Sequence, residues 1–480
     1  MLRSAWLLLL YLSFLGLGIT TPFVMTLGYV WVDTFQPQAV AYFVLNELPV
    51  AFIMGAGAVL TYVVLDRRSP PPVTITWVCQ VMLAIWMTTT LLWAELPDRA
   101  LTKWDWVFKA MAFAAFVPFV IRSRVQIEAF AQTYVFSLAA NFVPFGLKVL
   151  LSGGGYGRNL GLQGGNSGLA EGGLLSTVCL MAVPLALFLG KHGKLVPRLP
   201  MMNLAYAGIA VLAAATAIGT YERSALVGLV VLGFYMFLRS RRKWRFGLLA
   251  GIAAVAFIAL SAQSWNARIS TIDEYATESS ALTRLLIWQW TLGYASTHPL
   301  GGSFDAYGVS TIVMPSDPLH PGGYIQNGRA YHSIYFEVLG DLGYPGLLMF
   351  LLAAASSLFS LTALSRKCRK IPDLHWVADM SDAVQSGKLV FLSAGAFVGI
   401  AFQPPFWYFV AMGISLRAYV WHAERAEAGD LKGWRLVAQQ TREAMANRSV
   451  GRRGPHVPPG EEPARVPAWR GGPAVRRRGS

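Results

Sequence analysis

The feature that most constrains this chain is a series of apolar runs, each about 20 residues long, which recur from one end of the sequence to the other. A run of this length crosses about 30 Å of hydrocarbon as an α-helix. Because 55% of the 480 residues are hydrophobic and 14% are charged, a soluble globular fold is excluded. Strands of alternating polarity are not seen, which disfavours an outer-membrane barrel. We therefore expect an all-α polytopic integral membrane protein.

We expect about twelve transmembrane helices, counted from the lengths of the apolar runs. Residues 4–34 are too long for one span and contain Pro22, yet two full spans would break the alternation of the charged loops. We count them as one broken or re-entrant unit, retained as the first span and not cleaved as a signal peptide. The other expected spans are residues 49–66, 74–94, 104–121, 126–151, 172–190, 201–219, 223–239, 246–262, 333–360, 386–403 and 405–423.

Short clusters of basic residues separate many of these runs, and such clusters are retained on the cytoplasmic side of a membrane. We therefore place the protein in the bacterial inner membrane with both termini in the cytoplasm. The net charge of +15 comes from these loops and the tail, so the expected partner is the lipid bilayer and not a nucleic acid. The clusters are Arg67-Arg68, Arg122 with Arg124, and residues 191–198, 239–245 and 366–370.

The expected domain organisation follows from one long loop. Residues 1–262 are predicted to form an N-terminal transmembrane bundle, and residues 333–423 the C-terminal transmembrane helices. Between them, residues 263–332 form one large periplasmic loop with an amphipathic helix. Residues 424–480 form a basic cytoplasmic tail, expected to be disordered from about residue 448.

Four arginines and one histidine stand out because they lie at the outer ends of spans or in outer loops, on the side opposite the basic clusters. Singly, each has an ordinary interpretation as an interfacial side chain, a solvated helix face or part of a flexible glycine-rich connector. Together, several guanidiniums and an imidazole near a bilayer surface can form a site for a lipid-linked diphosphate. These residues are Arg158, Arg223, Arg284, Arg329 and His332.

Two carboxylates follow His332 where the chain re-enters the membrane. Glu337 and Asp341 are four residues apart and therefore share one helix face. We expect them to pair with arginines or to orient His332, although a water-filled cavity would also hold them.

Glycines recur every three residues in the same stretch, at Gly340, Gly343 and Gly346. On a helix this spacing allows the backbone of a neighbouring span to approach closely. Pro345 indicates that the helix is also kinked there.

We expect no metal and no cofactor. Three isolated cysteines and the absence of short Cys/His spacings disfavour disulfide frameworks and zinc sites. No compact Ser/His/Asp pattern or nucleotide-binding loop supports a serine hydrolase or an ATPase. Several polar residues of the large loop match no metal-binding pattern and are interpreted as loop structure: Asp305 and Asp317, His298 and His320.

Three segments, which together cover residues 220–350, resemble the O-antigen ligase and O-antigen polymerase superfamily of membrane glycosyltransferases. They are YERSALVGL with Arg223, TRLLIWQWTLGYASTHPLGG with Arg284 and Trp288, and AYHSIYFEVLGDLGYPGLLMF with His332. In the last segment, Ser333 stands where the family often has asparagine, and Asp341 where it commonly has glutamate. The N-terminal ITTPFVMTLGYVWVDTFQPQ is similar to a subgroup of O-glycosylation ligases associated with exosortase systems.

The resemblance implies a metal-independent transfer of a glycan from undecaprenyl diphosphate, with inversion at the anomeric carbon, to lipid A core oligosaccharide or to a protein. It also implies that Arg223 and Arg284 hold the diphosphate and that His332 acts on the acceptor hydroxyl. The residue types suit this chemistry, because guanidiniums stabilise a departing diphosphate and a neutral imidazole can accept a proton.

Three alternatives stay open. A polymerase would join lipid-linked repeat units with the same donor chemistry and would yield a ladder of chain lengths. A transporter or flippase of lipid-linked sugars should have charges near mid-span and an inverted repeat, whereas the charges here gather at one face. A purely structural assembly partner predicts that single arginine substitutions have no effect.

Overall fold

The computed structural model describes residues 2–41, 44–66, 68, 70–152, 171–196, 199–240, 243–244, 247, 276–316 and 320–427. In chain order, the helices and strands are α1 (Leu2–Gly18), α2 (Pro22–Phe35), α3 (Pro37–Val40), α4 (Val44–Glu47), α5 (Val50–Leu65), α6 (Ile75–Thr89), η1 (Thr90–Trp93), α7 (Pro97–Val120), α8 (Arg124–Ser152), α9 (Gly172–His192), α10 (Pro200–Gly219), α11 (Arg223–Arg239), α13 (Ala276–Thr297), η3 (Ala306–Val309), β1 (Thr311–Met314), β2 (Tyr324–Asn327), α14 (Ile334–Cys368), η4 (Pro372–Leu374), α15 (His375–Ala394), η5 (Gly395–Phe397) and α16 (Pro404–Glu427).

Five of the described helices are long and apolar enough to cross a membrane. They start at Ile75, Arg124, Gly172, Pro200 and Ile334, and the apolar helices α1 and α5 are shorter. The all-α membrane architecture expected from the sequence is therefore present, while the count of about twelve spans stays a prediction. All of the expected span 246–262 except residue 247, and most of the basic tail, lie outside the described residues.

The apolar runs locate most helices closely, and α11 has the predicted bounds. The N-terminal unit is interrupted as predicted, since α1 ends at Gly18 and α2 begins at Pro22. The bounds 386–403 were wrong, because α15 begins at His375 and ends at Ala394. Hydropathy missed its first turns because they carry Asp379 and Asp382, which lie in ion pairs with basic residues of other helices.

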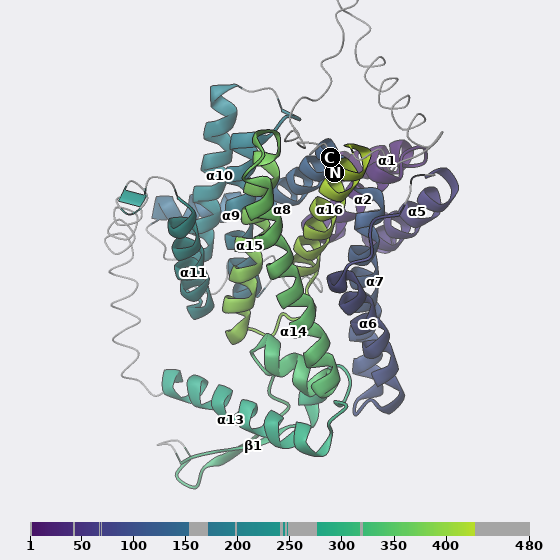
Figure 1. Ribbon diagram of the computed structural model, residues 1–480. Coiled ribbons are helices and arrows are strands. Elements are labelled where there is room, and N and C mark those ends of the chain that lie inside the picture. Colours follow the sequence, from purple (N-terminus) through teal and green to yellow (C-terminus); the bar gives the residue numbers. More distant parts are fainter. Residues whose placement is uncertain are drawn as a thin grey trace, which may run out of the picture.

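Helix α9 lies inside the bundle, with nearly all of its side chains buried. It packs against α8, α10, α11 and α15, while α14 packs against α6, α15 and α16 (Figure 1). The hydroxyls of Ser176 and Thr177 donate to the Gly173 carbonyl at 3.0 and 2.8 Å, so these buried polar groups are satisfied within the helix itself.

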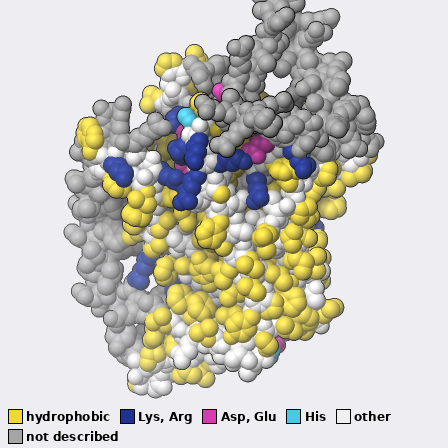
Figure 2. Space-filling model, viewed as in Figure 1, with side chains coloured by type: hydrophobic (Ala, Val, Ile, Leu, Met, Phe, Trp, Pro, Cys, Tyr) yellow, Lys and Arg dark blue, Asp and Glu magenta, His cyan; other side chains and the backbone are white. Residues whose placement is uncertain are grey.

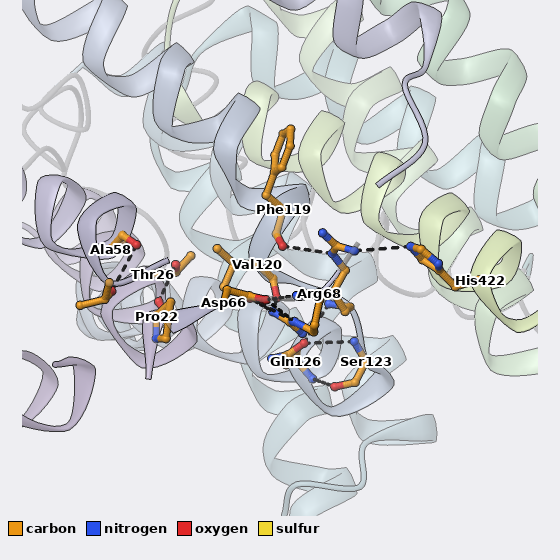
Figure 3. A network of polar contacts seen from close by, with 12 residues as sticks. Pro22, Thr26, Ala58, Asp66, Arg68, Phe119, Val120, Ser123, Gln126 and His422 are labelled. Atoms are coloured by element: carbon orange, nitrogen blue, oxygen red, sulfur yellow. Dashed lines mark hydrogen bonds and ion pairs between the residues drawn. The ribbon is translucent and has the colours of Figure 1, made fainter. Parts of the chain in front are cut away.

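The two ends of the bundle differ. At one end lie α13 and the hairpin β1–β2, whereas α1 and the C-terminal end of α16 lie at the other (Figure 1). Figure 2 shows Lys and Arg side chains gathered toward the latter end, above a broad hydrophobic face. There Arg68 pairs with Asp66 at 2.5 Å and donates to the Val120 carbonyl at 2.9 Å, while Arg122 lies 3.4 Å from His422 (Figure 3). We call this the basic end and the other the α13 end.

The α13 end contains a small antiparallel sheet that the all-α expectation did not include. Strands β1 and β2 pair Thr311 with Asn327 and Met314 with Tyr324. Alternate β1 side chains, Ile312 and Met314, are buried in a small apolar cluster with Ile287 of α13. This packing on α13 stabilises a strand pair that would be marginal alone.

Candidate active site

His332 lies at the α13 end, between β2 and the start of α14. Its backbone is left-handed, with φ of +50°, a conformation that non-glycine residues adopt only when the surroundings impose it. On one side, the Tyr331 carbonyl accepts a 2.8 Å hydrogen bond from Trp288 Nε1 of α13. On the other, the Ser333 carbonyl accepts from the Glu337 amide of α14 at 2.8 Å. The backbone on both sides of His332 is thus held at a junction between two helices.

Three arginines belong to the same neighbourhood. Burial lowers the pKa of His332 below its usual 6.5, and the nearby guanidiniums of Arg284 and Arg329 lower it further. The pKa of Arg284 is lowered mainly by burial and also by the charge of Arg223, while the charge of Glu222 raises it. Arg284 is therefore close enough to Arg223 and to His332 for their charges to influence one another, and Arg329 likewise influences His332. These four are among the five residues selected from the sequence.

The fifth, Arg158, lies outside the described residues. Of the others, Arg223 and Arg329 are exposed, while Arg284 and His332 are half-buried. Arg223 is the first residue of α11, Arg284 lies on α13, and Arg329 lies in the loop after β2. Two exposed guanidiniums beside a half-buried guanidinium and a half-buried imidazole make this part of the surface cationic, which suits an anionic group.

Trp288 connects α13, which carries Arg284, to the start of α14 and to the backbone beside His332. It lies one helical turn after Arg284 on α13, and its ring stacks on Phe336 of α14 with centroids 5.0 Å apart and planes 5° from parallel. Together with its hydrogen bond to Tyr331, this contact fixes α13 against the start of α14. The sequence placed Trp288 in a family-like segment but did not suggest this role.

The carboxylates behind His332 pair with a lysine that the sequence reading did not select. Lys103 Nζ, at the start of α7, lies 3.0 Å from Glu337 Oε1, 3.3 Å from Asp341 Oδ2 and 2.9 Å from Asp305 Oδ1. The basic partner of Glu337 and Asp341 is therefore a lysine and not an arginine, while the alternative that they orient His332 stays a prediction. Asp305, interpreted from sequence as loop structure, is the third member of this group, which we call the Lys103 cluster.

The Lys103 cluster is buried and carries more negative than positive charge. The Asp341 side chain is fully buried, and those of Glu337 and Lys103 are 8% and 15% exposed. The second oxygen of Glu337, Oε2, accepts from the Ala401 amide at 2.9 Å, which ties α14 to the segment before α16. The same segment passes His332, because a Cβ on Gly399 would lie 3.8 Å from the His332 amide nitrogen. The cluster thus supports the backbone around the imidazole.

Helix α14 is broken at Gly343, where φ is +67° and ψ is −169°. The loop at residues 299–302 enters this break: the Gly302 amide donates to the Gly340 carbonyl, and the Tyr344 amide to the Pro299 carbonyl, both at 3.0 Å. A Cβ on Gly343 would lie 2.3 Å from the Pro299 oxygen. The close approach predicted for these glycines is therefore real at Gly343, but its partner is this loop and not a neighbouring span.

The other two glycines serve different contacts. A Cβ on Gly340 would lie 2.2 Å from the Tyr331 hydroxyl, so this glycine makes room for the residue that precedes His332. A Cβ on Gly346 would lie 2.2 Å from Leu342 Cβ, across the break in its own helix. At the break, the Leu342 carbonyl accepts a hydrogen bond from Trp86 Nε1 at 2.8 Å, so this backbone group has a partner.

Within the described ranges, no three ligating side chains lie close enough together to hold a metal ion. The three carboxylates of the Lys103 cluster surround the Lys103 ammonium. The described residues around His332 offer guanidiniums that can bind an anion and an imidazole of lowered pKa that can accept a proton.

Two family models match the chain. Residues 208–351 match the family described as O-antigen ligase, and residues 2–194 match a family of unknown function. A search of curated proteins gives no match. His332, the three arginines around it and all three carboxylates of the Lys103 cluster fall in the first region, whereas Lys103 falls in the second. The two regions therefore meet at the Lys103 cluster.

Proposed function

Because the chain belongs to the O-antigen ligase superfamily, we propose that it transfers a glycan from undecaprenyl diphosphate to an acceptor hydroxyl at the periplasmic face of the bacterial inner membrane. One observation supports this proposal: Arg284 of α13 is close enough to Arg223 and to His332 for their charges to influence one another, so we expect a diphosphate held by the guanidiniums to lie near the imidazole. The acceptor is lipid A core oligosaccharide or a protein.

The arginines act on the leaving group. As the acceptor oxygen bonds to the anomeric carbon, the bond from that carbon to the diphosphate oxygen breaks, and its electron pair leaves with the diphosphate. Arg223 and Arg284 stabilise this growing charge, Arg329 adds a third guanidinium, and Arg158 is proposed to join them. Guanidiniums suit the task because they stay protonated and bind phosphate oxygens in a bidentate manner.

His332 acts on the acceptor. The hydroxyl must lose its proton as it attacks, and a neutral imidazole accepts it. Burial and the arginines lower the pKa of His332, so the base-competent form predominates at neutral pH. The resemblance implies inversion at the anomeric carbon without a metal, and a single displacement with one base agrees with it.

The Lys103 cluster and Trp288 have positioning roles. Glu337 bonds to both Lys103 and the Ala401 amide, and Trp288 holds the Tyr331 carbonyl, so His332 is fixed from both sides. Fixing a general base within a fraction of an ångström of its working geometry contributes to rate without any contact to substrate.

The test is transfer by purified protein reconstituted in liposomes with an undecaprenyl-diphosphate-linked glycan, each acceptor being offered separately. We expect Arg284→Ala to lower the transfer rate about 100-fold or more, the usual loss when one preorganised donor to developing charge is removed. Arg366→Ala, an exposed arginine near the other end of α14, is the matched control and should keep the wild-type rate. Wild-type transfer by Arg284→Ala would overturn the proposal, and a ladder of chain lengths would identify a polymerase.

A further inference from the structure

A second polar pocket lies at the basic end, far from His332. It has a volume of about 290 Å³ and lies between the C-terminal ends of α9 and α11 and the N-terminal half of α15. Helix α14 begins beside His332 and ends one residue before Arg369, which lines this pocket. The length of α14 therefore separates the two places, and the proposed transfer site does not use this pocket.

Basic groups outnumber carboxylates in this pocket. Lys191, Arg239 and Arg369 line it together with two carboxylates, Asp379 and Asp382. Lys191 lies 2.6 Å and Arg369 3.6 Å from Asp379, while Arg239 lies 3.3 Å from Asp382. His192 lies 2.7 Å from Asp379 and would add a further charge when protonated. The aspartates hold the cations in place, and at least one positive charge remains unbalanced.

The cations are accessible as well as fixed. The side chain of Lys191 is 68% exposed, and those of Arg369 and Arg239 are 36% and 32% exposed. The Arg239 guanidinium lies over the Tyr235 ring at 5.4 Å, which orients its donors. An anion entering the pocket could thus meet three basic side chains from three different parts of the chain.

The pocket also lies where an apolar surface ends. Helix α11 exposes Val230, Phe234 and Leu238, spaced four residues apart and therefore on one face, and Arg239 follows directly. The pocket wall includes Leu187 of α9, which is 38% exposed. This change from apolar to basic surface marks the level of lipid headgroups, where a phosphate and the start of an acyl chain occur together.

We propose that this pocket binds the phosphate headgroup of an anionic phospholipid of the cytoplasmic leaflet, with Lys191, Arg239 and Arg369 as the phosphate ligands and Leu187 beside the acyl chain. Basic pockets between transmembrane helices on this side recognise anionic headgroups in the same way. The bound lipid would hold α9, α11 and α15 together at the end of the bundle opposite the proposed transfer site.

The test is native mass spectrometry of the full chain in detergent, titrated with phosphatidylglycerol. Lys191→Gln and Arg239→Gln should each weaken binding about five-fold, the loss expected for one basic residue near an anionic headgroup. Each aspartate keeps another basic partner in these variants, so the fold should be retained. Arg366→Gln, an exposed arginine of the basic end that does not line the pocket, should bind as the wild type does.

Two results would overturn the proposal. Equal affinity in all four proteins would show that the pocket does not select phosphatidylglycerol. Displacement of the lipid by an equal concentration of inorganic phosphate would assign the pocket to a free phosphate compound. Phosphatidylcholine with the same acyl chains should bind weakly and should not distinguish the variants. Because the readout is lipid binding, failure here leaves the proposed transfer reaction untouched.

Discussion

Replacing Lys103 by methionine should be among the most destabilising single changes at the α13 end. The substitution keeps most of the side-chain volume but removes the ammonium that faces Asp305, Glu337 and Asp341 at 2.9 to 3.3 Å. Asp341 is fully buried and Glu337 nearly so, so their charges would be left without a cation. Breaking a buried ion pair on one side costs about 3–5 kcal/mol, and we expect this loss in the free energy of unfolding.

The assay is equilibrium unfolding in mixed micelles of a mild detergent and dodecyl sulfate at neutral pH. Lys367→Met is the matched control, because Lys367 pairs with Glu424 at 2.5 Å while both side chains are about half exposed. Lys367→Met should lower the free energy of unfolding by at most about 1 kcal/mol, because its ion pair is exposed to solvent. The double variant Lys103→Met with Asp341→Asn should lose less free energy of unfolding than the sum of the two single variants. The reason is that Asp341→Asn removes a buried negative charge that Lys103→Met leaves without a partner. Equal losses for Lys103→Met and Lys367→Met would refute this reasoning.

Three further predictions concern the residues around His332. Arg284→Gln should move the acidic limb of the pH–rate profile to higher pH, because removing a neighbouring cation raises the pKa of His332. An unchanged acidic limb would show that the protonation of His332 does not control the rate. Gly343→Ala should lower the free energy of unfolding by about 3 kcal/mol or more. The control is Gly233→Ala, which should be neutral or stabilising because a Cβ there meets nothing within 4 Å. Similar effects of the two substitutions would contradict the close contact between Gly343 and Pro299. Trp288→Phe should lower kcat by about two-fold to ten-fold with little change in KM, as expected when one positioning hydrogen bond is lost; a change in KM alone would argue for substrate contact.

The sequence predicts the helices well because each is an apolar run of membrane-spanning length, as α11 shows. It also predicts that Arg223, Arg284 and His332 lie on one side of the membrane, because all three belong to outer ends of spans or to an outer loop. It cannot identify Lys103, whose partners lie 202 to 238 residues away. Lys103 looks like an ordinary loop-edge lysine until tertiary packing surrounds it with carboxylates.

The break in α14 shows the same limit. Pro345 and the glycine spacing indicate an irregular helix, but the loop that fills the break lies more than 40 residues earlier in the chain. The hairpin was missed for a related reason. Its four-residue strands are too short to stand out, and β1 is stabilised by packing on α13.

The most direct test of the central claim compares His332→Ala with His320→Ala in the reconstituted transfer assay, with binding of the lipid-linked donor measured on the same samples. His320 lies at the same end of the molecule, in the segment before β2, and its ring centroid lies 4.5 Å from that of Tyr324 with the planes tilted by 38°. We predict that His332→Ala binds donor normally but transfers about 100-fold more slowly or worse, whereas His320→Ala stays within two-fold of the wild type. A wild-type rate of transfer by His332→Ala would contradict the role of His332 as the base that activates the acceptor.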